Sequence, residues 1–192
     1  MGYGSEIQAA GTESGVVRMN IFVLSTNPVE AAHFHCDQHL HKMILESAQM
    51  LSTAAHSFFS HLKGHIYAPA YQNHPCTQWV CESPNHMVWV CVLATTLNEI
   101  REDSGSNRHS SMDIIEAIAD NLNTDYILTD LVFAEAMYPH IKIRTDLTTV
   151  QKYQLYYRKK HEHWLLTKGK GMSYKGRAIP EFMAGMKGIS GG

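Results

Sequence analysis

The stretch from His33 to His56, HFHCDQHLHKMILESAQMLSTAAH, constrains the fold of this chain most strongly. With helical spacing, one stripe of it is almost entirely apolar, and the neighbouring face carries His35, His39, Lys42, Glu46 and Gln49. The polar face is either a set of solvated or core-bonded side chains or one wall of an active site. In the second case we expect the nearby cations to lower the pKa of Glu46 and keep it ionised, as a base or a stabiliser of positive charge.

The rest of the chain predicts a mainly α-helical bundle with at most one short N-terminal strand. Residues 20–24, NIFVL, form a short β-type run. Asn27-Pro28, Ser83-Pro84 and Thr145-Asp146 are typical helix starts, with a capping side chain followed by proline or a polar residue. The helices that we predict cover 28–63 with a break near Phe34, 77–82, 85–102, 112–122, 125–137 and 148–167.

A chain of 192 residues with 44% hydrophobic content fits one domain with a substantial core. We expect a flexible leader at 1–18, a helical domain at 19–183 and a flexible tail at 184–192. No apolar run approaches the roughly 20 residues of a membrane-spanning helix, and the N-terminus lacks a signal-peptide pattern. The expected location is cytoplasmic, with no membrane partner, and the four cysteines are expected to stay reduced.

The formal net charge of −2 hides a strong asymmetry along the chain. Residues 152–192 hold nine lysines and arginines against two glutamates, an excess of seven positive charges. The predicted helix 148–167 interleaves these charges with aromatic residues, namely Tyr156, Tyr157 and Trp164. This pattern is either a solvated charged face or a surface for sugars, bases and phosphates, and a polyanionic partner suits it.

Two kinds of chemistry fit the histidine face. His35 and His39 could be two metal ligands one helical turn apart, with a site completed by Cys36, Asp37, His74 or Cys76. No second ligand pair at standard spacing follows, which favours metal-free acid/base work on a bound anion, so we expect no metal ligands and no cofactor. Gly-rich phosphate loops, Gly-x-Ser-x-Gly elbows and His-Glu-x-x-His motifs are absent from the sequence. P-loop hydrolases, common serine hydrolases and zincins are therefore not leading candidates.

Several short motifs occur in an order and spacing that resemble a known family. They are Met19-Asn20-Ile21, Asp37-Gln38-His39-Leu40 with Glu46 seven positions past the histidine, Asn73-His74-Pro75 with Trp79, Tyr156-Tyr157-Arg158, and Ser173-Tyr174-Lys175-Gly176. Together they resemble the small helical pyrimidine dimer DNA glycosylases of phage and bacteria, and a phage-borne group of relatives more closely. The resemblance covers most of residues 19–182.

This resemblance implies a metal-free, single-domain enzyme that bends duplex DNA, opens a base pair and cleaves an N-glycosidic bond. Glu46 matches the family's essential acidic residue and His39 a histidine near the reacting sugar. A carboxylate there would stabilise the oxocarbenium character that develops on the sugar, and the base must leave the stack to be reached. The other residues expected to contact DNA or substrate are Asn20, His35, Gln49, Asn73, His74, Trp79, Tyr157, Arg158, Lys159, Lys160 and Lys175.

The sequence departs from the family at the nucleophile. The phage enzymes use the α-amine of a processed N-terminal threonine, whereas here eighteen residues precede Met19 and Asn20 follows it. We therefore expect direct hydrolysis, with Asp37 or Glu46 activating water, and retain Lys42 as an amine nucleophile for a weak abasic-site lyase activity. A family arginine is replaced by Gln49, so the recognition surface also differs.

These departures favour a bulky or hypermodified pyrimidine, such as glucosylated hydroxymethylcytosine of phage DNA, over an ultraviolet lesion. The expected role is then antiviral defence instead of DNA repair, with double-stranded DNA as the partner and no obligate protein partner. Two other classes remain as alternatives: a non-catalytic DNA-binding or His-ligated metal-binding phage accessory protein, and a hydrolase of free nucleotides. The latter would show little of the salt dependence of a DNA binder.

Overall fold

The computed structural model describes residues 20–122 and 130–191 of the chain. As predicted, this part is mainly helical. Its elements are α1 (Pro28–His33), α2 (Asp37–Phe58), η1 (Ser60–Leu62), α3 (Pro75–Glu82), α4 (Pro84–Asp103), α5 (Met112–Ala119), α6 (Pro139–Lys142), α7 (Thr149–Lys168), β1 (Ser173–Tyr174), η2 (Glu181–Met183) and β2 (Ser190–Gly191). The predicted leader at 1–18 lies outside the described residues.

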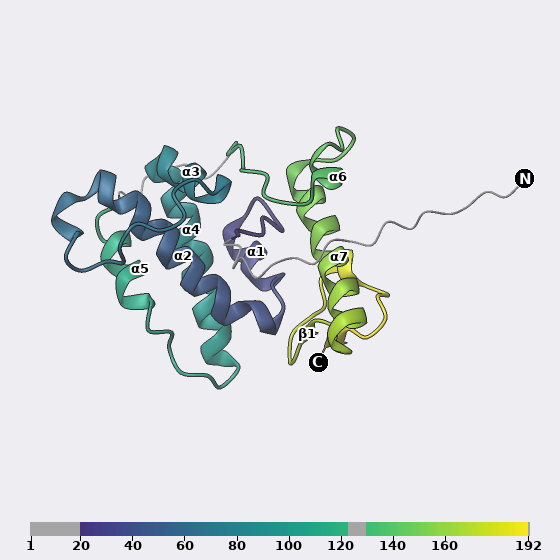
Figure 1. Ribbon diagram of the computed structural model, residues 1–192. Helices are drawn as coiled ribbons and strands as arrows, with labels where there is room; N and C mark the ends of the chain where they lie inside the picture. The colour runs from purple at the N-terminus through teal and green to yellow at the C-terminus, as the bar shows by residue number, and fades with distance from the viewer. Residues whose placement is uncertain (1–19, 123–129, 192) are drawn as a thin grey trace, which may run out of the picture.

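The helices form two groups. Helix α2 packs against α3, α4 and α5, and α1 packs against α4, while α7 contacts α6 and η2. Figure 1 shows the first group on one side and α6, α7 and β1 on the other, with α1 and the segment before it between them. Among the described helices, none is long and apolar enough to cross a membrane.

The first predicted helix is broken where the sequence indicated. The Asn27 side chain accepts hydrogen bonds from the first turn of α1, and Pro28 takes the first helical position. Helix α1 ends at His33, and α2 begins at Asp37 after the turn at Phe34. Helix α2 ends five residues before the predicted end at 63, and the remaining turn is the 3₁₀ helix η1.

Helix α7 starts from a different cap than we predicted. The Thr148 hydroxyl accepts the Gln151 N–H at 3.2 Å, and the Gln151 side chain accepts the Thr148 N–H at 2.9 Å, which forms a capping box. Asp146, part of the predicted cap, instead pairs with Arg144. The aromatic and basic helix therefore begins at Thr149.

The run at residues 20–24 forms no strand. Ile21 to Leu24 are each 3% exposed or less, because the run lies between the two helical groups. Among the described residues no strand lies beside it, and two of its backbone groups bond to side chains instead. Asn20 N–H donates to Glu46, and the Leu24 carbonyl accepts a hydrogen bond from Gln154. A continuous apolar run here reflects burial on all sides and not sheet formation.

The predicted helix at 125–137 is wrong for its described part, 130–137. Several backbone groups of this stretch are bonded to side chains from elsewhere in the chain. Trp79 Nε1–H donates to the Val132 carbonyl at 2.7 Å, and the Tyr153 hydroxyl donates to the Ala134 carbonyl at 2.8 Å. Tertiary hydrogen bonds thus outweigh the helical spacing of the sequence.

The C-terminal residues pack against α7. Strands β1 and β2 pair in parallel, with Ser173 beside Ser190. A Cβ atom at Gly171 would overlap the Gly188 carbonyl oxygen and the His161 ring, so only glycine fits this close approach. Within the tail that we predicted at 184–192, Gly188 packs against Gly171 and residues 190–191 pair with β1, and its flexibility stays a prediction.

An ion pair joins the C-terminal segment to the start of α2. Arg177 Nη2 donates to Asp37 Oδ1 at 2.7 Å, and the Lys175 N–H donates to Asp37 Oδ2 at 2.9 Å. Arg177 also donates to the His33 and His35 carbonyls. Burial alone would raise the pKa of the Asp37 carboxyl, but the bonds from Arg177 and Lys175 outweigh it and lower the pKa below its ordinary value.

We expect Asp37→Asn to lower the free energy of unfolding by about 1–2 kcal/mol at pH 7, because a partly exposed charged hydrogen bond is lost. Since the folded pKa is lowered, this contribution is present above the ordinary carboxyl pKa and is lost as the pH falls through the folded value. Urea unfolding should show the gap between variant and wild type closing below about pH 4. Asp113→Asn is the control, since it breaks an exposed pair with Arg108. A gap that is unchanged at pH 3 would contradict this account.

Candidate active site

Of the predicted polar face, His39, Lys42, Glu46 and Gln49 lie along one side of α2. His35 precedes the helix by two residues, and its ring centre lies 6.3 Å from that of His39. His35, His39 and Glu46 are buried. The His39 ring stacks on Phe22 at 5.0 Å between centroids and meets the edge of Trp164 at 5.2 Å. The segment at 20–24 and helix α7 therefore cover this face.

Glu46 is the acidic group of this face, and its side chain is 4% exposed. Its Oε2 accepts the backbone N–H of Asn20 at 3.0 Å. Its Oε1 lies 3.3 Å from Lys42 Nζ, an ion pair without an aligned hydrogen bond. Burial raises the pKa of Glu46, and the Asn20 N–H and the Lys42 ammonium offset only part of this effect. The expectation that cations lower the pKa of this carboxyl is therefore wrong in its net direction.

Two lysines lie near this carboxylate, Lys42 from α2 and Lys160 from α7, and Lys168 lies further along α7. The Lys42 side chain is 48% exposed, and Lys160 is partly buried. Burial lowers the pKa of Lys160, repulsion from Lys42 lowers it further, and attraction to Glu46 opposes both. An amine and a carboxyl are thus both moved toward their neutral forms at one place.

Aromatic rings line the same place. Lys160 Nζ lies 5.4 Å from the centre of the Trp164 ring and 5.8 Å from that of Phe22. Lys168 Nζ lies 4.8 Å from the centre of the same Trp164 ring. These are cation–π distances. We call Lys42, Glu46, Lys160, Trp164 and Lys168 the α2–α7 cluster.

His39 holds α2 against α7. Its Nδ1 lies 2.6 Å from the Tyr157 hydroxyl, which also accepts the Cys36 N–H at 2.9 Å. We assign the hydroxyl proton to the bond with His39, which leaves Nδ1 as the acceptor. Burial holds the pKa of His39 well below its ordinary value, and the charges of His35 and Lys160 add to this effect. His39 is therefore neutral at pH 7 and orients its neighbours.

The structure does not bring Asp37 to Glu46. The two residues lie nine positions apart on α2, about half a turn away in direction at roughly 100° per residue. The Asp37 carboxylate is occupied by Arg177 and the Lys175 N–H. Glu46 thus remains the candidate for the activation of water, and Asp37 has a structural position.

The predicted Asn73-His74-Pro75 element and Trp79 do not form one surface. His74 caps α3 by accepting the Cys76 N–H, while Asn73 is exposed in the preceding loop. Trp79 is buried, stacks on His86 at 4.2 Å between ring centres and bonds to a backbone carbonyl. Trp79 therefore belongs to the core and not to a DNA-facing surface.

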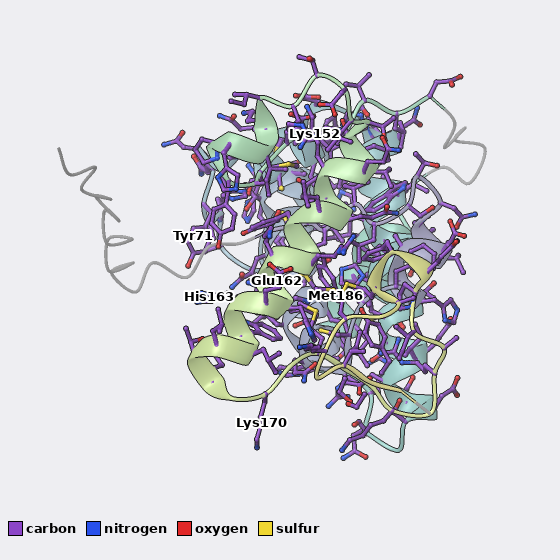
Figure 2. The ribbon with its side chains drawn as sticks, turned by 90° about the vertical axis from the view of Figure 1, so that its right-hand side faces the viewer. Tyr71, Lys152, Glu162, His163, Lys170 and Met186 are labelled. Atoms are coloured by element: carbon purple, nitrogen blue, oxygen red, sulfur yellow. The ribbon has the colours of Figure 1, made fainter. Side chains whose placement is uncertain are left out.

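The predicted basic residues also lie in different surroundings. Arg158, Lys159 and Lys175 are exposed, whereas Lys160 belongs to the α2–α7 cluster. Lys159 pairs with Glu162 at 2.8 Å. Figure 2 looks onto α7, with Lys152 near its start, Glu162 and His163 further along, and Lys170 beyond its end.

A cavity of about 480 Å³ adjoins the site. It is lined by Asn20, whose N–H binds Glu46, together with His74, Lys142 and Tyr156. Its volume falls within the range of small-molecule pockets. It brings together two predicted site residues, Asn20 and His74, that lie far apart in the sequence.

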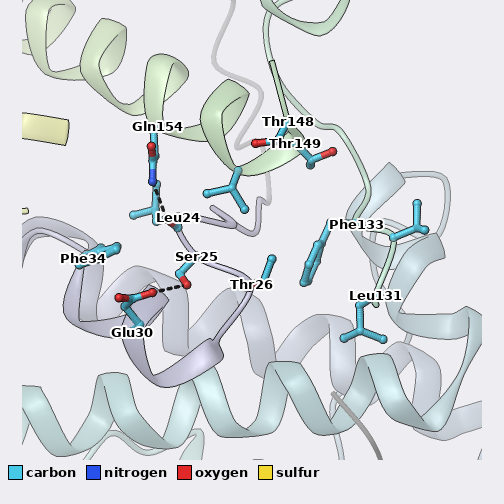
Figure 3. A pocket seen from close by; sticks show the side chains of 12 residues that line it. Leu24, Ser25, Thr26, Glu30, Phe34, Leu131, Phe133, Thr148, Thr149 and Gln154 are labelled. Atoms are coloured by element: carbon cyan, nitrogen blue, oxygen red, sulfur yellow. Dashed lines mark hydrogen bonds between the residues drawn. The ribbon is translucent and has the colours of Figure 1, made fainter. Parts of the chain in front are cut away.

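A second cavity, of about 690 Å³, lies between the segment at 24–26, the segment at 131–133 and the start of α7 (Figure 3). Its charged lining residue is Glu30, which accepts a hydrogen bond from the Ser25 hydroxyl. No lysine or arginine is among the residues that line it. This cavity therefore offers no positive charge to attract a polyanion.

Sequence reasoning gave no site role to Phe22 and Lys168, and it treated Trp164 only as one aromatic of a basic helix. The sequence did contain a signal for Trp164 and Lys168. Lys160, Trp164 and Lys168 recur every fourth residue and so share one face of a helix. Phe22 carried no such signal, because its place against His39 depends on the path of the segment before α1.

The structure gives no support to the His-ligated alternative. Within residues 20–122 and 130–191, no group of three or more His, Cys, Asp or Glu side chains is placed to hold a metal ion. His35 uses Nδ1 to bond to the Ala31 carbonyl, and His39 uses Nδ1 to bond to Tyr157. The pair therefore lacks a third ligand in the described part of the chain.

The buried His35 predicts a loss of stability in mild acid. Burial lowers its pKa to about 4, so between about pH 4 and 6.5 the unfolded chain binds a proton that the folded chain does not. Stability therefore falls as the pH decreases, by about 2 kcal/mol from this group at pH 5. In His35→Leu, the slope of the free energy of unfolding against pH should decrease by about one proton between pH 4.5 and 6. Urea unfolding measures this slope, with exposed His65→Leu as the control. Equal slopes in His35→Leu and wild type would refute the prediction.

A comparison of the chain with models of protein families, with curated proteins and with solved structures found no match.

Proposed function

We propose that this chain is a DNA glycosylase that extrudes a bulky or hypermodified pyrimidine from duplex DNA and excises it, leaving an abasic site. The observation that carries the proposal is the buried Glu46 carboxylate, fixed by the Asn20 N–H and faced by the ammonium groups of Lys42 and Lys160. The order of the motifs that resemble pyrimidine dimer glycosylases also supports Glu46 as the catalytic acidic residue. Glucosylated hydroxymethylcytosine of phage DNA is the example that we favour, with antiviral defence as the role.

The geometry suits cleavage of a C1′–N bond. As the bond breaks, positive charge develops on the sugar, and a carboxylate held in place stabilises it without reorganisation. Water adds to C1′ and gives a proton to Glu46, while an ammonium group from Lys42 or Lys160 gives a proton to the departing base. The raised pKa of Glu46 and the lowered pKa of Lys160 favour both transfers near neutral pH.

Substrate can reach the Glu46 carboxylate only if the Lys42 side chain above it moves. Glu46 is 3% exposed, whereas the Lys42 side chain above it is 48% exposed. A DNA phosphate would attract Lys42 away from Glu46 and open the path for the sugar. In this account the ion pair protects the carboxylate in the free protein and is broken by substrate.

The surroundings supply the other parts of a glycosylase site. Lys160 and Lys168 present positive charge to phosphates, and the partly exposed Trp164 ring between them can stack on a base or sugar. The cavity beside Asn20, with Tyr156 and His74 in its lining, is the candidate pocket for the extruded base.

The function is tested by incubating the purified protein with unmodified, irradiated and glucosylated hydroxymethylcytosine DNA and measuring abasic sites. We expect abasic sites on the glucosylated DNA. Abasic sites on none of the three DNAs would end the glycosylase proposal. Borohydride trapping would reveal the alternative in which the Lys42 amine attacks C1′, because a covalent protein–DNA adduct would then form.

The variant Glu46→Gln should lower the rate of base release by about 10²-fold or more while the dissociation constant for duplex DNA stays nearly unchanged. The reason is that the amide keeps the shape of the side chain but cannot stabilise positive charge or accept the proton. Glu99→Gln, an exposed position on α4, is the matched control. A non-catalytic DNA-binding protein would be indifferent to either change, so equal behaviour of the two variants would favour that class.

The α7 surface is tested by Lys168→Gln. Removal of one phosphate contact should weaken duplex binding for all sequences and reduce the slope of log K against log salt by about 0.9. The rate of base release at saturating DNA should stay the same. Exposed Lys63→Gln, outside the α2–α7 cluster, should leave the slope unchanged. Identical slopes for Lys168→Gln and wild type would remove α7 from the DNA surface.

A further inference from the structure

A third cavity, of about 970 Å³, lies between the start of α2, the end of α4 and the segment around β1. From α2 it is lined by Asp37, Gln38 and His41, which do not belong to the face that carries Glu46. Its apolar floor includes Leu40 and Ile100. The proposed glycosylase chemistry uses none of these residues.

Three basic side chains line this cavity: Arg101 from α4, and Lys175 and Arg177 from the segment around β1. The Nη1 atom of Arg101 is buried without a hydrogen-bond partner among the described residues. Arg177 has partners at both Nη atoms, but its Nε is buried without one. Each of these two nitrogen atoms has lost water without gaining an acceptor, which is costly in the free protein. An anion would relieve that cost.

The charge balance of the cavity favours an anion. Its carboxylates are Asp37 and Asp103, and Arg177 neutralises the first of them. Asp103 is exposed at the end of α4. Arg101 and the exposed ammonium group of Lys175 then exceed the one remaining carboxylate, and His33 and His41 add N–H donors to the lining.

We propose that this cavity is a second binding site, for a phosphate group, with Arg101 and Lys175 as its ligands. Arginine presents a planar set of N–H donors that matches phosphate oxygens, and lysine adds a mobile charge. The phosphate belongs either to the backbone of a DNA strand or to a free phosphate compound. This site is separate from the proposed catalytic group, because it lies on another face of α2 and includes neither Glu46 nor the other residues of the α2–α7 cluster, although Lys175 is among the residues that the sequence led us to expect near DNA.

The test uses the full chain with two probes, pyrophosphate and an unmodified DNA duplex, and measures each affinity by calorimetry. The variants are Arg101→Gln and Lys175→Gln, and Arg144→Gln, an arginine outside the cavity, is the control. Thermal unfolding checks that each variant folds. Lys175→Gln changes an exposed side chain, so it carries the test if Arg101→Gln does not fold.

We expect both cavity variants to weaken at least one probe by 5-fold or more, on the order of one lost charged hydrogen bond, while the control does not. Weaker duplex binding, with a salt slope reduced by about 0.9, assigns the site to the DNA backbone. Weaker pyrophosphate binding with unchanged duplex binding assigns it to a free phosphate compound. The proposal is overturned if neither probe distinguishes the cavity variants from Arg144→Gln. Because no probe requires base release, a failed glycosylase assay leaves this result intact.

Discussion

The Tyr157 hydroxyl group holds the two halves of this molecule together at the candidate site. It accepts the Cys36 N–H at the start of α2 and bonds to Nδ1 of His39 one turn later, at 2.9 and 2.6 Å. Helix α7 meets α2 through side chains, among them Trp164, whose ring lies 5.2 Å from that of His39. This junction therefore sets the position of the next turns of α7, which bring Lys160 and the rings beside it to the polar face of α2.

The same junction accounts for the electrostatics of the site. By covering the polar face, α7 and the segment at 20–24 remove water from a carboxyl, an amine and two imidazoles. Desolvation favours the neutral form of each group, which raises the pKa of Glu46 and lowers those of Lys160 and His39. Such an arrangement costs stability, and perturbed groups of this kind cluster at functional sites. The phosphate site that we propose has a different origin, since Arg101, whose Nη1 is buried without a partner, lies beside a cavity there.

Local sequence patterns predicted most of the helices. The features that they did not predict depend on contacts between residues far apart in the sequence. Helical spacing alone placed Glu46 and Lys42 on one face, and the cap at Asn27 set the start of α1. The pairing of Asp37 with Arg177 joins residues 140 positions apart, so no local pattern could separate Asp37 from Glu46. In the same way, the backbone at 130–137 is bonded to side chains of α3 and α7, which helical spacing cannot reveal.

In the glycosylase that we propose, Glu46 faces the sugar carbon at which positive charge develops. The most direct measurement compares the affinity of the protein for two duplexes, one with a cationic pyrrolidine in place of the target sugar and one with a neutral tetrahydrofuran. We predict that the wild-type protein binds the cationic duplex more tightly, by about 10²-fold or more, and that Glu46→Gln loses this preference. Equal affinity of the wild-type protein for both duplexes would contradict the account, whichever base is excised.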